Sequence, residues 1–207
     1  MRALSIDTTR PVVLLTGFGP FPGIADNVTG TLVPHLAKSA RKLFPHPRFV
    51  TDILPTEWDA GPRRLDELMS RHRPRLSLHF GVDAGADGFK IETQGANECA
   101  AREDARAALP PQASIVTDGP ARLSATLPVE VIVAALKSRG LPVSLSDSAG
   151  RYLCNAILYR SLWHCTQPGR FARSGFVHLP HDLERGPLSF DQALEGGLAI
   201  IAACLDE

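Results

Sequence analysis

Cys154 is the residue of this sequence whose type and position most directly indicate chemistry. It lies in the segment SDSAGRYLCN at 146–155, between an apolar run at 141–145 and a helix-like run at 152–164. The cysteine is therefore expected in or near the first turn of a helix, where unpaired N–H groups and the helix dipole favour an anion. A thiolate is such an anion, so the position predicts a nucleophile. The alternative is a small buried cysteine that fills a strand–helix junction.

Two other residues could assist such a nucleophile. His178 ends the apolar run at 175–178, just before Pro180, where a general base could stand beside a strand–helix nucleophile. Glu92 lies in the apolar run at 89–93, and a carboxylate there needs a partner because burying it unpaired is costly. Glu92 is expected either to orient a catalytic histidine or to lie on a solvated strand face.

Metal and nucleotide sites are disfavoured. His178 has histidine and acidic neighbours, but Pro180 interrupts any helix that would align two histidines, and no HExxH motif is present. Gly17 and Gly19 begin a dinucleotide fingerprint, yet a proline stands where its third glycine is needed. We therefore expect neither a metal nor an organic cofactor. The other histidines are expected to be ordinary surface or packing residues: His35, His46, His72, His79 and His164.

Two aromatic residues lie on the loop after the first apolar run. Phe18 and Phe21 follow a predicted strand at 12–16, and ligand sites of α/β proteins form beyond the carboxyl ends of strands. These side chains are expected either to wall a ligand pocket or to pack into the core.

The elements that must position these residues alternate between strand and helix. Strands are expected at 12–16, 48–54, 75–82, 88–93, 142–145 and 175–179. Helices are expected at about 29–44, 59–72, 124–139, 152–164 and 189–205, with Thr29 or Thr31 as the first cap and Ser189 as the last. This alternation predicts an α/β fold: a three-layer αβα sandwich with a mostly parallel, mixed central sheet flanked by helices. Residues 98–122 lack strong periodicity and are expected to form an extended excursion.

The composition narrows the class of protein. The chain has 207 residues, 44% of them hydrophobic, which suits a single α/β domain over residues 1–207. Basic and acidic residues number 22 each, so neither nucleic acid nor a membrane is expected as a partner. The four cysteines form no CxxC pair and are expected to be reduced thiols in the cytoplasm. The first seven residues do not have the pattern of a signal peptide.

Five segments, in order, resemble the pyroglutamyl peptidase I family of cysteine peptidases, also called pyrrolidone carboxyl peptidases. They are LTGFGPF with Asn27, the segment at 81–97, DGPA followed by TLP, SDSAGRYLCN, and GFVHLP. The resemblance places Cys154 on the nucleophile, His178 on the catalytic histidine and Glu92 on the catalytic glutamate. It implies that a thioester acyl-enzyme forms while an N-terminal pyroglutamyl residue is removed from a peptide. It also suggests a homo-oligomer, either a tetramer or a dimer.

The chain departs from the family pattern at four positions, of which Val82, in place of a glutamine, affects recognition most. The others are Val28, Ala86 and Thr93. Val82 cannot make the polar contacts of an amide, which leaves open a related cysteine amidohydrolase with another N-acyl amide or lactam substrate. A non-catalytic binding protein on the same fold is a further alternative. Because the pyroglutamyl group is a neutral lactam that suits an apolar slot, the expected substrate-binding residues are Phe18, Phe21, Val82 and Asn27.

Overall fold

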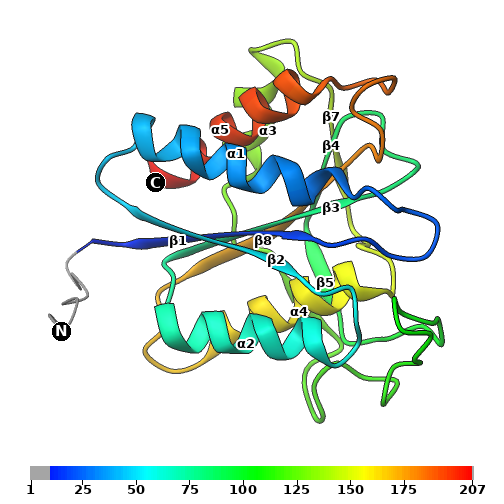
Figure 1. Ribbon diagram of the computed structural model, residues 1–207. Coiled ribbons are helices and arrows are strands. Elements are labelled where there is room, and N and C mark those ends of the chain that lie inside the picture. Colours follow the sequence, from blue (N-terminus) through cyan, green and yellow to red (C-terminus); the bar gives the residue numbers. More distant parts are fainter. Residues whose placement is uncertain (1–9, 207) are drawn as a thin grey trace, which may run out of the picture.

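The computed structural model describes residues 10–206, which form one large sheet with helices on both faces (Figure 1). The strands of this sheet are β1 (Val12–Phe18), β2 (Arg48–Leu54), β3 (Leu76–Val82), β4 (Phe89–Glu92), β7 (Val143–Ser146) and β8 (Arg173–Leu179). They lie in the order β2-β1-β3-β8-β4-β7. Neighbouring strands are parallel except β4 and β8, which are antiparallel. The expected mixed, mostly parallel sheet is confirmed.

The helices form a layer on each face of this sheet. In Figure 1 the upper layer contains α1 (Val28–Leu43), α3 (Val129–Lys137) and α5 (Phe190–Leu205). The lower layer contains α2 (Ala60–His72) and α4 (Leu153–Thr166). Each layer buries its own apolar cluster, with Leu36 and Ile200 in the upper one and Leu65 and Ile157 in the lower one. Full burial of such a side chain stabilises the fold by about 1.5–3 kcal/mol, so the two clusters hold the three layers together.

Helix α1 begins at Asn27 rather than at a threonine. The Oδ1 atom of Asn27 accepts hydrogen bonds from the N–H of Thr29 at 3.2 Å and from its hydroxyl at 2.8 Å. The Thr29 hydroxyl also accepts the N–H of Phe18 at 3.0 Å, so it binds the last residue of β1. The expected cap at Thr29 or Thr31 is therefore wrong, because the asparagine side chain accepts a free N–H group in the first turn of the helix.

The excursion expected at 98–122 is present and connects the two strands of a second, small sheet. Its two antiparallel strands are β5 (Gln94–Ala96) and β6 (Arg122–Ser124). The loop between them is tied by polar side chains, since Asn97 Oδ1 accepts the N–H groups of Ile115 at 2.8 Å and Val116 at 2.9 Å. In Figure 1 this green segment lies at the lower right, beside the start of α4.

Several expectations concern features outside the sheet. Within residues 10–206, no helix has both the length and the hydropathy of a membrane span. All four cysteines fall in this part of the chain and are free thiols. The first seven residues, which are not expected to be a signal peptide, lie outside the described residues.

Candidate active site

Strand pairing brings His178 and Glu92 to one face of the sheet. His178 lies opposite Lys90 in the antiparallel ladder of β4 and β8. Glu92 lies opposite Phe176, two residues after Lys90 on β4 and two residues before His178 on β8. Side chains alternate between faces along a strand, so His178 shares the face of Phe176, which packs with α2 and α4. There His178 Nδ1 lies 2.8 Å from Glu92 Oε1, and the side chains are 6% and 0% exposed.

Cys154 reaches the same place from α4. It is the second residue of this helix, as its sequence position predicts. A Cβ atom added to Gly81 of β3 would lie 3.2 Å from Cys154 Sγ, and Gly81 is the register partner of His178 in the β3–β8 ladder. The sulfur therefore lies over the strand next to His178, and the two side chains line one cavity of about 560 Å³. The first N–H groups of α4 have no acceptor within the helix, so an anionic oxygen beside Cys154 can bind them.

The charge state of His178 depends on both of its neighbours. Burial by itself lowers the pKa of His178, but the charge and hydrogen bonding of Cys154, and then of Glu92, outweigh it and raise this pKa to about 10. The second carboxylate oxygen of Glu92 is buried and has no hydrogen-bond partner among residues 10–206. The Glu92 carboxylate therefore acts mainly on the imidazole, and the imidazolium is the favoured state of His178 at neutral pH.

Two of the four expected substrate-binding residues line this cavity. Phe21 and Val82 border it together with Cys154 and His178. The ring of Phe21 also packs against Tyr152, with 6.3 Å between the ring centroids. The apolar side chains form a wall next to the reactive groups, an arrangement that suits a small, uncharged acyl group.

The other two expected residues, Phe18 and Asn27, are not brought into the cavity of Cys154. Phe18 is 2% exposed, and its ring centroid lies 6.1 Å from that of Phe176. Asn27 caps α1 and donates from Nδ2 to the carbonyl of Gly19 at 3.2 Å. Both line a neighbouring cavity instead. The expected contact of Phe18 and Asn27 with substrate finds no support in this geometry, because both side chains are already used by the fold.

The cavity contains side chains that the sequence does not single out. Arg102 comes from the excursion, and its guanidinium carbon lies 4.6 Å from the ring centroid of Tyr152, the residue that precedes α4. Arg151 and His181 also line the cavity. The only sequence signal for Arg102 is its place in a segment without periodicity, and nothing local connects that segment to Cys154.

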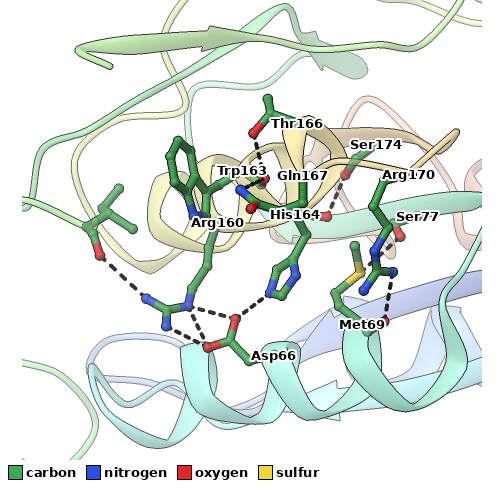
Figure 2. A network of polar contacts seen from close by, with 12 residues as sticks. Asp66, Met69, Ser77, Arg160, Trp163, His164, Thr166, Gln167, Arg170 and Ser174 are labelled. Atoms are coloured by element: carbon green, nitrogen blue, oxygen red, sulfur yellow. Dashed lines mark hydrogen bonds and ion pairs between the residues drawn. The ribbon is translucent and has the colours of Figure 1, made fainter. Parts of the chain in front are cut away.

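Helix α4 is fixed to α2 by a polar network on the side shown in Figure 2. Asp66 of α2 accepts hydrogen bonds from Arg160 Nε at 2.8 Å and Nη2 at 2.6 Å, and from His164 Nε2 at 2.8 Å. Burial alone raises the pKa of Asp66, but the hydrogen bonds of His164 and Arg160 outweigh this and lower it. These contacts hold in place the helix that carries Cys154.

A second, fully buried polar chain ties α4 to the sheet. His79 of β3 lies 2.7 Å from Thr16 Oγ1 through Nδ1 and 2.9 Å from Ser161 Oγ of α4 through Nε2. The Ser161 hydroxyl is 2.6 Å from that of Ser174 on β8. Burial lowers the pKa of His79 to about 3, so the imidazole is neutral and can donate at one nitrogen and accept at the other. His79 is thus a packing residue that bridges β1, β3 and α4.

Comparison with known proteins identifies the family. The family described as pyroglutamyl peptidase matches residues 11–187. The chain belongs to this family. A pyrrolidone-carboxylate peptidase from Oceanobacillus iheyensis is 31% identical over 199 residues, which cover 94% of this chain and 98% of that protein. Pyrrolidone-carboxylate peptidase 1 from Ralstonia nicotianae is 34% identical over 172 residues, or 83% of this chain and 79% of that protein.

Solved structures agree with this assignment. Bacillus amyloliquefaciens pyroglutamyl peptidase I superposes with a TM-score of 0.85 at 28% identity, covering 95% of this chain and 98% of that one. A mutant pyrrolidone carboxyl peptidase from Pyrococcus furiosus gives a TM-score of 0.84 at 28% identity, covering 94% and 98%. The expected fold and family are therefore confirmed. The chain is a cysteine-type omega peptidase, and its reaction is the removal of an N-terminal pyroglutamyl residue.

Proposed function

We propose that Cys154, His178 and Glu92 form the triad that carries out this hydrolysis. The Cys154 thiolate attacks the pyroglutamyl carbonyl carbon, the C–N bond breaks, and the leaving amine takes its proton from His178. The acyl group is now a thioester on Cys154. His178 then takes a proton from water, whose oxygen attacks the thioester carbon, and the C–S bond breaks to release pyroglutamate and restore the thiolate.

The observation that carries this proposal is the position of His178 between the other two groups. One side of the imidazole is held by Glu92 at 2.8 Å, and the cavity that it borders also contains Cys154. Glu92 fixes the imidazole orientation and stabilises its positive charge. The N–H groups of the first turn of α4 can bind the oxyanion, and each such donor typically contributes about 3 kcal/mol to the transition state.

We also propose that the cavity wall holds the lactam mainly by packing. Phe21 and Val82 border the same cavity as Cys154. Since a valine cannot hydrogen-bond the lactam, shape and main-chain contacts must select the ring. The substrate is thus a peptide whose first residue is a compact, neutral ring.

The direct test is hydrolysis of a fluorogenic pyroglutamyl amide by matched cysteine variants. The wild-type protein and Cys165→Ala are expected to be active, because Cys165 lies near the far end of α4. Cys154→Ala is expected to be folded and inactive. Turnover by Cys154→Ala at the rate of Cys165→Ala would overturn the triad.

We further propose that the protein works as a homo-oligomer, a dimer or tetramer, in the cytoplasm. Large exposed apolar side chains, Phe171 at 80% and Leu43 at 60%, support association, and four free thiols suit a reducing compartment. Light scattering after gel filtration at micromolar concentration should give a multiple of the chain mass, and a monomer would contradict the proposal.

A further inference from the structure

The catalytic cavity has a positive charge that a neutral lactam does not require. Two of the charged side chains that line it are already paired: Asp83 with Lys90, and Arg151 with Glu98 at 2.9 Å. Arg102 also lines the cavity, but no carboxylate within residues 10–206 forms an ion pair with it. The charged side chain of the cavity that remains unpaired is therefore a cation, and a ligand that complements it is an anion.

Arg102 is held in place by contacts that leave its N–H groups accessible. The guanidinium lies over the face of Tyr152, 4.6 Å from the ring centroid, and the Tyr152 hydroxyl donates to the carbonyl of Glu103 at 3.1 Å. The main chain is fixed as well, since Trp58 Nε1 donates to the Arg102 carbonyl at 2.8 Å. No hydrogen bond to the Arg102 guanidinium is made by another side chain of residues 10–206, so its N–H groups remain available for a bidentate contact with a carboxylate.

The loop that carries Arg102 is itself a built structure. Asp104, 2% exposed, accepts the N–H groups of Trp58 at 2.8 Å, Arg106 at 2.8 Å and Ala108 at 3.0 Å. Burial raises the pKa of Asp104, but these main-chain hydrogen bonds outweigh it and lower the pKa. The backbone that follows Arg102 is thereby anchored next to the catalytic cavity.

We propose that Arg102 binds a carboxylate on the residue that follows pyroglutamate, so that the enzyme prefers substrates with an anionic leaving residue. This inference rests on the proposed triad, which places the scissile bond in the same cavity. The C-terminal carboxylate of a pyroglutamyl dipeptide lies two bonds from the scissile nitrogen, roughly 2.5 Å away, and the side-chain carboxylate of aspartate or glutamate lies slightly further. Both fit one cavity of about 560 Å³.

Three substrates test the proposal: pyroglutamyl-alanine, its C-terminal amide, and pyroglutamyl-glutamate amide. The wild-type kcat/KM for pyroglutamyl-alanine is expected to exceed that for its amide by about tenfold, the usual effect of one charge-assisted hydrogen bond. In Arg102→Gln this ratio should fall to about one, and Arg102→Lys should keep part of it. The third substrate shows whether a side-chain carboxylate substitutes for the terminal one.

The matched control is Arg106→Gln, on the same loop. Arg106 is 76% exposed, pairs with Glu57 and lies outside the cavity, so this variant should keep the wild-type ratio. Added salt should lower the wild-type ratio without any substitution, because ions screen an exposed pair. Intrinsic fluorescence, to which Trp58 and Trp163 both contribute, should stay that of wild type in Arg102→Gln if the loop keeps its place, because Trp58 donates to the Arg102 carbonyl.

Two results would overturn the assignment of Arg102. One is a wild-type enzyme that cleaves acid and amide equally well. The other is a kcat/KM that falls equally for pyroglutamyl-alanine and for its amide in Arg102→Gln. Such a result would mean that Arg102 acts on the reacting carbonyl or only supports the loop. A wild-type protein that cleaves none of the three would instead refute the triad itself.

Discussion

Replacing Glu92 by glutamine isolates the effect of one buried charge on catalysis. Glu92 Oε1 lies 2.8 Å from His178 Nδ1, and the carboxylate is 0% exposed. A glutamine keeps the length and one acceptor oxygen but removes the charge. Hydrogen bonds to a charged group contribute about 1.5–3 kcal/mol, and about 1.4 kcal/mol changes a rate tenfold. We therefore expect kcat/KM of Glu92→Gln for a pyroglutamyl amide to fall by about 10- to 100-fold.

The same substitution is expected to lower thermal stability at neutral pH. Glu92 helps to raise the pKa of the buried His178, so its loss removes part of the stability that the protonated imidazole contributes. The unpartnered Glu92 Oε2 is a desolvated part of a charged group, and a neutral amide relieves only part of the cost of burying it. Thermal unfolding should therefore show a Tm below that of wild type, so the pH profile and not the Tm separates positioning of His178 from a structural role.

The pH profile supplies the decisive readout. Because Glu92 helps to raise the pKa of His178 to about 10, its loss should move the alkaline limb of kcat/KM to lower pH. The stability that protonated His178 contributes is complete below about pH 6.5, its unfolded pKa, and is lost as pH rises through about 10. Wild-type kcat/KM with an unshifted alkaline limb in Glu92→Gln would refute the reasoning. Glu67→Gln, a 56% exposed carboxylate on α2, is the control.

Three further predictions concern the surroundings of the nucleophile. A Cβ atom at Gly81 would lie 2.7 Å from the Phe176 ring and 3.2 Å from Cys154 Sγ, so Gly81→Ala should displace the sulfur and lower kcat at least about tenfold in steady-state assays; an unchanged kcat would contradict this placement. Asp66→Asn should destabilise the fold by about 1–2 kcal/mol, because it removes the carboxylate that pairs with the half-buried Arg160 guanidinium and accepts from His164 of α4. Since the pKa of Asp66 is lowered, denaturation curves of variant and wild type should converge as pH falls below that pKa; a constant difference would count against the network. Iodoacetamide at neutral pH should alkylate Cys154 first, because burial raises the pKa of the other three thiols, and peptide mapping that finds uniform labelling would oppose a thiolate at this position.

Several features of the fold follow from local sequence and were predicted well. The strand over Arg48–Leu54 has the predicted bounds, because an apolar run closed by a proline is a local signal. Ser189 starts the last helix through a capping box with Gln192, a motif that spans only four residues. Cys154 lies in the first turn of its helix for the same reason, because glycine and serine precede a continuous helical pattern. That residues 1–207 form a single domain stays a prediction.

Contacts between distant segments were not available from such local signals. The sequence by itself determined which residue types can react and which elements carry them, including Cys154, His178 and Glu92 on three separate segments. Only the tertiary structure decided that β4 runs antiparallel to β8, which places Glu92 beside His178, and that the excursion returns to bring Arg102 to the same cavity. The physical reason is that secondary structure depends on neighbours along the chain, whereas strand order, ion pairs and cavity walls depend on which distant surfaces bury each other.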